Sequence, residues 1–445
     1  MILNKKDSNE ILSIAWPTII GMIGSTLMGL FDTAMVGRLS AEALAAVGLG
    51  NMLIWTAGSL VNSVNVGVQT VAARRVGEKK YSECGESIHN GIILSLIFGT
   101  LMTVLMWPFL TKIFPYINDD PSVVSMGNEY MAWRVAGILP AMLHFAFYGF
   151  FNGIGKTKVH IRASLISNSL NIFLNYVLIF GKFGFPAMGV KGAALGTVIS
   201  TSVSALIYFI WLLNPKIKDR YHVFKTSFYN KIIMRRIFSL SFASGVQNFF
   251  VLIGFTLFLI IVGRMGTFEL AATDIIFNIL SFSFMPGFGF GLAAGTLVGN
   301  YMGKQNFERA AELTRETIIL NVIFMGAIGV IFMLIPRQIL SLFTLEAEVI
   351  NIGVIPLRIL GIVQFIDAVG MTLMGALRGA GDTSYVAWVD TLINWFIFIP
   401  LTWFFGFYLG YGINGAWAAF IIYLVIFATL MYRRFLAGKW KDIVV

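Results

Sequence analysis

The fold of this chain is decided by residues 237–263, which read IFSLSFASGVQNFFVLIGFTLFLIIVG without a single Lys, Arg, Asp or Glu. An α-helix needs about 20 such residues to cross the hydrocarbon core of a bilayer. The whole chain has the same character, because 57% of its 445 residues are hydrophobic, 12% are charged and the mean hydropathy is +0.81. Soluble proteins carry roughly 25% charged residues. The sequence therefore predicts an all-α integral membrane protein.

Twelve apolar segments of spanning length follow one another along the chain. Most of them contain no charged residue, one is interrupted, and the last two are separated by a cluster of glycines. We predict these segments at residues 11–36, 43–73, 88–111, 135–155, 163–181, 192–215, 237–263, 275–303, 317–336, 349–377 and, as a pair, within 391–432.

The basic residues between these segments are distributed unevenly. Most of the 32 Lys and Arg residues fall before the first segment, in every second connection and after the last segment. Because basic residues accumulate on the cytoplasmic side of membrane proteins, we expect both termini in the cytoplasm. The same distribution explains the net charge of +10 without a nucleic-acid partner. Cys84 is the only cysteine, so neither an intrachain disulfide nor a cysteine-based zinc site can form.

An internal repeat divides the chain into two halves. Val36-Gly37-Arg38 returns as Val262-Gly263-Arg264, and Gly149 returns at the same offset as Gly375. Six helices per half is an even number, so the halves must be parallel repeats, as in transporters whose substrate path lies between them. We predict an amino-terminal six-helix bundle at 1–213, a cytoplasmic linker at 214–236, a carboxyl-terminal six-helix bundle at 237–436 and a cytoplasmic tail at 437–445.

Acidic residues inside the predicted segments are candidates for function, because an ionisable group in lipid is costly. Asp32 lies late in the first segment, Asp274 early in the eighth and Asp367 midway along the tenth, and none has an acidic counterpart in the other half. An ion pair between Asp367 and Arg358 stays open as an alternative, as does an interfacial position for Asp32. An interfacial position is favoured for two further acids, Glu129 and Asp390.

Two asparagines in the fifth segment, Asn171 and Asn175, lie four residues apart and so share one face of a helix. Their amides can hydrogen-bond a carboxylate from another helix, offer oxygens to a hard cation, or simply join two helices. Pro17 removes a backbone hydrogen bond fifteen residues before Asp32 and gives the first segment a bending point. The chain shows no hydrolytic triad or metal-binding pair, so we do not expect an enzyme.

Several motifs together resemble those of the multidrug and toxic compound extrusion (MATE) transporters, and the similarity covers essentially the whole chain. Pro17 belongs to this pattern. The other motifs are MGLFDTAMVGRLSAEALAAVGLG at 28–50, ARRVGEKK at 73–80, NGIGKTK at 152–158, LNIFLNYVLIFG at 170–181, GVKGAALGT at 189–197 and FIDAVGMTLMGALRGAGDT at 365–383.

This resemblance implies roles for named residues of the amino-terminal bundle. In the family, two six-helix bundles form a V-shaped, alternating-access exporter of cationic amphipathic compounds, driven by inward flow of protons or sodium. Asp32 matches the essential acid of the first helix. Asn171, Asn175 and Thr197 fall where the family's amino-terminal cation site has its ligands.

In the carboxyl-terminal bundle the match is incomplete. Asp367 corresponds to an acid used by sodium-linked members, and Asp274 resembles a residue that faces the substrate cavity. The glutamate that accompanies the first of these acids in the family corresponds to Gly254 here. The resemblance therefore favours the amino-terminal bundle as the site of ion coupling.

We therefore expect a monomeric, proton- or sodium-coupled antiporter that exports cationic drugs across the plasma membrane of a bacterium or archaeon. Beyond a sodium ion we expect no cofactor, and the partners are the substrate, the coupling ion and membrane lipid. The alternative is a flippase for lipid-linked oligosaccharides or lipids from the same superfamily. A positively charged cavity would favour that alternative, but the charges within the predicted segments are mainly acidic, with Arg134 and Arg358 as the exceptions.

Overall fold

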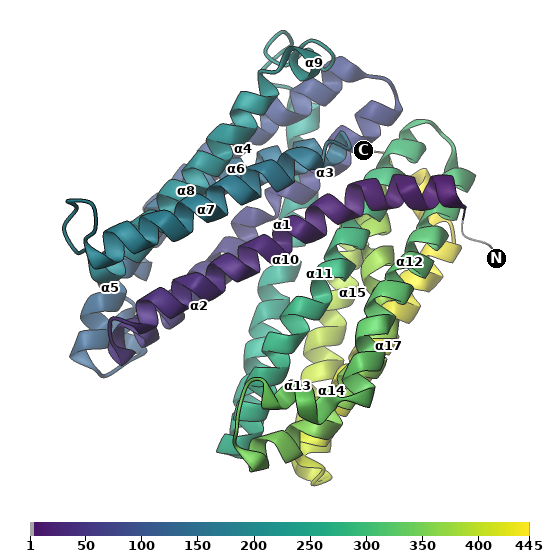
Figure 1. The fold of residues 1–445 in the computed structure, drawn as a ribbon. Helices are drawn as coiled ribbons and strands as arrows, with labels where there is room; N and C mark the ends of the chain where they lie inside the picture. Colours follow the sequence, from purple (N-terminus) through teal and green to yellow (C-terminus); the bar gives the residue numbers. More distant parts are fainter. Residues whose placement is uncertain (1–3, 445) are drawn as a thin grey trace. The chain divides into compact units, whose positions relative to one another are not determined.

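The computed structural model describes residues 4–444, which form helices joined by short connections and contain no strand (Figure 1). Eleven helical stretches in this part of the chain are long and apolar enough to cross a membrane, when Ala41–Gly77 and Thr383–Tyr408 are each counted as one. The count becomes twelve when α5 (Pro121–Ala136) and α6 (Ile138–Gly153), which meet at a bend of 44°, are taken as one span. The prediction of a multi-pass helical membrane protein is confirmed. Its fourth segment, expected as one helix at 135–155, is longer and bent.

The chain folds as two compact units. One consists of Ile20–Gly245, and the other combines the start of the chain through Ile19 with the residues from Val246 onward. The first unit holds most of α1 (Lys5–Gly37), α2 (Ala41–Asn62), α3 (Val64–Gly77), α4 (Tyr81–Leu110), η1 (Phe114–Tyr116), α5, α6, α7 (Lys158–Phe180), α8 (Gly189–Leu212), α9 (Pro215–Lys218) and the beginning of α10 (Lys231–Gly263).

The second unit contains the remaining helices, of which α11, α12 and α14 pack most extensively on one another (Figure 1). Its elements are the rest of α10, α11 (Thr267–Gly303), α12 (Phe307–Leu334), α13 (Pro336–Ser341), α14 (Ala347–Ala380), α15 (Thr383–Ile393), the π-helix η2 (Asn394–Phe398), α16 (Ile399–Trp403), the π-helix η3 (Phe404–Tyr408), α17 (Gly412–Leu436) and η4 (Lys439–Asp442).

Both boundaries between the units fall inside helices. The unit boundary divides α1 between Ile19 and Ile20, and it divides α10 at the repeat-related place, between Gly245 and Val246. The beginning of α1 packs within the second unit, where Ile11 and Ala15 join the core formed with α11 and α12. The predicted bounds placed α1 wholly in the amino-terminal bundle and began the carboxyl-terminal bundle within α10, at residue 237, whereas the compact units divide α1 after Ile19 and α10 after Gly245.

The internal repeat is visible in the backbone. Helices α1 and α10 both have 33 residues, and both of their ends are separated by the same offset that relates Gly149 to Gly375. Gly149 lies so close to the carbonyl oxygen of Asn65 that a Cβ there would stand 2.4 Å from it. The repeat-related pair is Gly375 and Gly291, where the corresponding distance is 2.0 Å. Glycine allows this close backbone approach in both halves. The predicted repeat is therefore confirmed.

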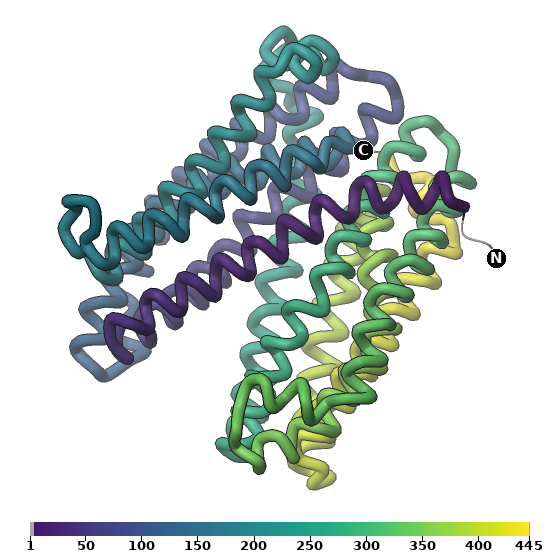
Figure 2. The backbone as a smooth tube through the Cα atoms, viewed as in Figure 1, coloured from purple at the N-terminus to yellow at the C-terminus, as the bar shows by residue number. Residues whose placement is uncertain are grey.

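Pro17 lies inside α1, two residues before the unit boundary. The helix is assigned without a break from Lys5 to Gly37, and Figure 2 shows its backbone as one continuous coil. In this conformation Pro17 does not end the helix. A bend there during transport stays a prediction.

Candidate functional site

A chain of hydrogen bonds links three helices of the first unit. Asn175 Nδ2 on α7 donates to Asp32 Oδ1 on α1 over 2.6 Å and to Asn171 Oδ1 over 3.2 Å. Asn171 Nδ2 in turn donates to Thr197 Oγ1 on α8 over 3.4 Å. Both asparagines are fully buried. The structure thus brings together the four side chains that the sequence named for the coupling ion. Their role in binding an ion stays a prediction.

The local sequence explains how this chain is built. Asn171 and Asn175 occupy successive turns of α7, so their amides stack along one face. Gly196 on α8 makes room for them, because a Cβ at that position would lie 2.1 Å from Asn175 Oδ1. Within residues 4–444 this buried oxygen accepts no hydrogen bond. Since buried polar atoms are normally paired, it is a free acceptor beside the carboxylate of Asp32.

The charge of Asp32 is only partly compensated by protein groups. The side chain is half-buried, and it interacts electrostatically with Arg134. The ion pairs found in the described part of the chain do not include one between these two residues. A carboxylate, two amide oxygens and a hydroxyl are the oxygen ligands that sodium or another hard cation uses. The same carboxylate can instead take up a proton.

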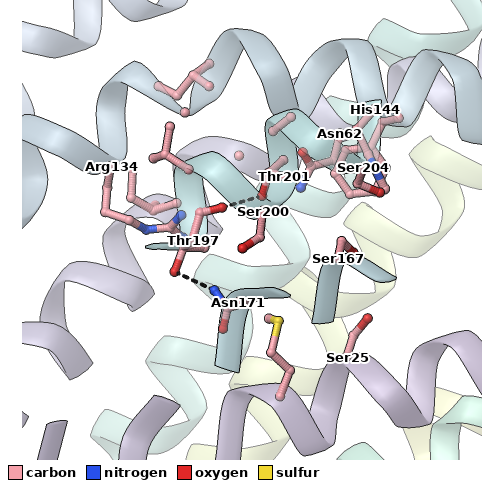
Figure 3. A pocket seen from close by; sticks show the side chains of 18 of the residues that line it. Ser25, Asn62, Arg134, His144, Ser167, Asn171, Thr197, Ser200, Thr201 and Ser204 are labelled. Atoms are coloured by element: carbon pink, nitrogen blue, oxygen red, sulfur yellow. Dashed lines mark hydrogen bonds between the residues drawn. The ribbon is translucent and has the colours of Figure 1, made fainter. Parts of the chain in front are cut away.

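A cavity of about 390 Å³ lies beside this chain, wholly within the first unit. Asn171 and Thr197 line it, whereas Asp32 and Asn175 do not. Figure 3 shows Arg134 and Thr197 at one side of the cavity and His144 and Ser204 at the other. Asp32 therefore communicates with the cavity through the two asparagines. Further polar side chains in the lining are Ser25, Asn51, Asn62, His160, Ser164, Ser167, Asn168, Ser200 and Thr201.

The two predicted cavity acids of the second unit differ in exposure. Asp274 on α11 is exposed, whereas Asp367 on α14 has only 5% of its surface exposed. In the described residues Asp367 Oδ2 has no hydrogen-bond partner, and Asp367 forms no ion pair with Arg358, which is exposed. Neither acid lines the cavity of the first unit. Their assignment to a substrate cavity stays a prediction.

Sequence reasoning missed a polar network in the second unit. It favoured an interfacial position for Asp390, but this residue is buried on α15 and has only 7% of its surface exposed. The carboxylate accepts hydrogen bonds from Gln247 Nε2 at 2.6 Å and from the Tyr423 hydroxyl at 2.5 Å. The side-chain oxygen of Gln247 accepts a bond from Arg378 at 2.8 Å. Residues so far apart in the chain give no local sequence signal. These hydrogen bonds lower the free-energy cost of burying the carboxylate of Asp390.

Two other positions clarify the sequence analysis. Glu129 pairs with Lys191 over 3.1 Å, and both side chains are substantially exposed, which agrees with a peripheral position. At Gly254 a Cβ would lie 1.8 Å from Asn394 Oδ1, so Asn394 occupies the space that a larger side chain on α10 would need. The space that the family's glutamate would need at this position is therefore filled by the Asn394 side chain, which comes from η2.

Comparison with known proteins identifies the family. The MatE family model matches residues 17–177 and 243–404 of the chain. The chain belongs to the MatE family. The starts of the two matched segments are related by the offset of the internal repeat. As a MATE protein the chain is a membrane transporter and not an enzyme.

Similar MATE proteins extend over the same length. The probable multidrug resistance protein NorM of Thermotoga maritima is 30% identical over 435 residues, covering 97% of this chain and 93% of that protein. The uncharacterized transporter YisQ of Bacillus subtilis is 26% identical over 435 residues, covering 97% and 94%.

Solved structures confirm the MATE fold. A crystal structure of MATE in complex with MaL6 superimposes with a TM-score of 0.90 at 23% identity and covers 98% of both chains. An outward-facing conformation of a multidrug resistance MATE family transporter has a TM-score of 0.89 at 23% identity, covering 98% of this chain and 97% of the other.

Proposed function

We propose that this MATE transporter exports cationic amphipathic drugs and toxic compounds in exchange for an inward-moving proton or sodium ion. The multidrug resistance proteins to which the chain is similar support drug export. The observation that carries the ion coupling is the bonded chain from Asp32 through Asn175 and Asn171 to Thr197, because it connects a carboxylate to the wall of a cavity.

In this mechanism Asp32 receives the coupling ion. A charge surrounded by protein and lipid needs a partner, so the carboxylate holds either the ion or a competing positive group. Asn171, Asn175 and Thr197 supply the remaining oxygens. Competition between ion and substrate is reciprocal, so an inward ion gradient lowers the affinity for substrate on the outer side.

Helix α1 is the element through which ion loading acts on both units. Asp32 belongs to the first unit, whereas the first turns of the same helix pack in the second unit, where Asp7 pairs with Arg309. Pro17 lies between these two regions. Bending α1 near Pro17 would change how its two ends are held, and Asp274 and Asp367 would add negative charge to the substrate path.

The test compares two carboxylates of the first unit. Asp32→Asn removes the charge but keeps a side chain of the same size, so ethidium efflux from cells should fall to the level without the transporter. Glu129→Gln is the matched control and should leave efflux unchanged, because Glu129 is exposed and paired with Lys191. Full efflux in Asp32→Asn, at equal membrane abundance, would refute the proposal.

Vesicles containing the purified protein would assign the ion. Ethidium transport is measured first under a sodium gradient and then under a proton gradient. The gradient that drives transport identifies the ion that is exchanged. We further propose a monomer in the plasma membrane of a bacterium or archaeon, with both termini in the cytoplasm. The distribution of basic residues in the connections supports this orientation.

A second candidate function is flipping of a lipid or lipid-linked oligosaccharide. One observation favours it: Arg134 is the single formally charged side chain in the lining of the described cavity. A phosphate-bearing substrate would be attracted by that charge. Transfer of a fluorescent phospholipid between vesicle leaflets, with no ethidium efflux, would support the flippase over the drug exporter.

A further inference from the structure

We infer that the cavity of the first unit binds the anionic group of an amphipathic solute, a carboxylate or phosphate, with Arg134 as its principal partner. This inference goes beyond the proposed function, because it assigns to the cavity a class of solute other than the cationic compounds of that proposal. Among the described residues that line the cavity, none is a Lys, Asp or Glu, and Arg134 is the sole arginine. An arginine stays charged under all physiological conditions and presents several donors to a carboxylate or phosphate.

The surroundings of Arg134 leave it able to bind a ligand. Its guanidinium lies 5.8 Å from the ring centre of Tyr130, on the same helix. In the part of the chain that the structure describes, Arg134 forms no ion pair within 4 Å, and its Nε has no hydrogen-bond partner. Asp32, which interacts with it electrostatically, lies beyond that distance and outside the lining of the cavity. Since the site lies among membrane-spanning helices, an arriving anion would be attracted more strongly than in water.

An unpaired hydroxyl provides independent support for a ligand. Ser204 lines the cavity from α8, and only 2% of its surface is exposed. Its Oγ has no hydrogen-bond partner among residues 4–444. Figure 3 places Ser204 beside His144, on the side of the cavity opposite Arg134. Because a buried hydroxyl is normally bonded, this group is available to a polar atom of a bound solute.

The rest of the wall sets the shape of the solute. Ile54, Trp55, Val61 and Phe145 contribute apolar surface, and the volume of about 390 Å³ lies within the usual range for small-molecule sites. An aromatic or aliphatic body with one anionic group satisfies both the apolar wall and Arg134. A solute whose only charge is positive would face Arg134 without a counter-charge in the lining.

The test uses three probes with the same ring system but different charge: 2-naphthoate, 2-naphthalenemethanol and 2-naphthylmethylammonium. Their binding to the full-length protein is measured by calorimetry in phosphatidylcholine nanodiscs. We expect naphthoate to bind at least about tenfold more tightly than the ammonium probe, as a charge-assisted hydrogen bond predicts. Tighter binding of the ammonium probe would overturn the inference.

Substitutions locate the binding. Arg134→Gln should weaken the binding of naphthoate about tenfold or more without changing the affinity for the neutral alcohol. Arg358→Gln is the matched control, because Arg358 occupies the corresponding place in the other half and is exposed. Arg134→Lys keeps the charge but loses the paired donors of the guanidinium, so it should weaken naphthoate binding by a smaller factor and keeps the test decisive if the Arg134→Gln variant does not fold. Equal effects of Arg134→Gln and Arg358→Gln would contradict the inference.

Two further measurements separate the remaining outcomes. If the natural anion is a lipid headgroup, phosphatidate added to the nanodiscs should compete with naphthoate. If the natural anion is a soluble solute, phosphatidate should leave the binding of naphthoate unchanged. Either result is consistent with an anion site in the cavity. Ethidium efflux by the wild type tests the proposed export function separately. Efflux that depends on Asp32, together with no preference for naphthoate, would remove only the inference about the anion.

Discussion

Gly196→Ala tests the predicted ion site without changing any charge. A Cβ at this position would lie 2.1 Å from Asn175 Oδ1, whereas real Cβ atoms keep at least 3.0 Å from such neighbours. The amide or its surroundings must therefore shift by about 0.9 Å, and a shift directed away from Asp32 would lengthen the 2.6 Å bond from Asn175 Nδ2 to at most about 3.5 Å, the limit of a hydrogen bond. A hydrogen bond to a charged group contributes about 1.5–3 kcal/mol. Its loss corresponds to a change of about 10- to 150-fold in affinity.

The quantity to measure is the ion concentration that gives half-maximal ethidium transport in vesicles. It should rise by about tenfold or more in Gly196→Ala, because the ligands around Asp32 are displaced. Gly48→Ala is the matched control: Gly48 lies in the same unit and has no atom within 4 Å of the added Cβ. An unchanged half-maximal concentration in Gly196→Ala, with thermal stability equal to that of the control, would refute the role of Asn175.

Two further predictions concern stability. Gly153→Ala should lower the melting temperature, because its Cβ would lie 2.7 Å from a carbonyl oxygen of α3 and overpacking costs about 1–3 kcal/mol. Gly48→Ala should leave the melting temperature unchanged. Equal melting temperatures for the two variants would contradict the packing argument. Asp382→Asn should also destabilise the protein, by about 3 kcal/mol, because Arg434 donates to this buried carboxylate at 2.7 and 3.3 Å. Thermal unfolding in detergent measures this loss. Asp219→Asn should have little effect, since its pair with Lys225 is exposed, and a similar loss there would indicate a nonspecific cause.

The membrane fold could be predicted because its signal is local. A run of about 20 apolar residues must form a helix in lipid, where unpaired backbone groups are too costly, so each span is specified by its own composition. The repeat was equally accessible, because glycines such as Gly149 and Gly375 recur where two backbones touch. The bend between α5 and α6 was not predicted, although the sequence marks it: Pro140 cannot donate a hydrogen bond to the carbonyl of Ala136, four residues earlier, and Gly137 lies between the two helices.

The candidate ion site was predicted in part. The spacing of Asn171 and Asn175 gives one helical face from the sequence alone, and Asp32 stands out as an acid inside an apolar segment. Thr197 was added by the resemblance to a known family. Asn175 donates to Asp32, and Asn171 donates to Thr197. Both contacts depend on how α1, α7 and α8 pack. No periodicity in one helix specifies its distance to another.

The sequence by itself determined that this protein is helical, spans the membrane many times and is built from two related halves, because hydrophobicity and repetition are properties of the chain. Only the tertiary structure decided that Asp390 is buried with Gln247 and Tyr423, and that Arg134 is the charge in the cavity wall. These properties depend on which side chains from distant helices meet. The free energy of a buried charge is set by those neighbours and not by its place in the sequence.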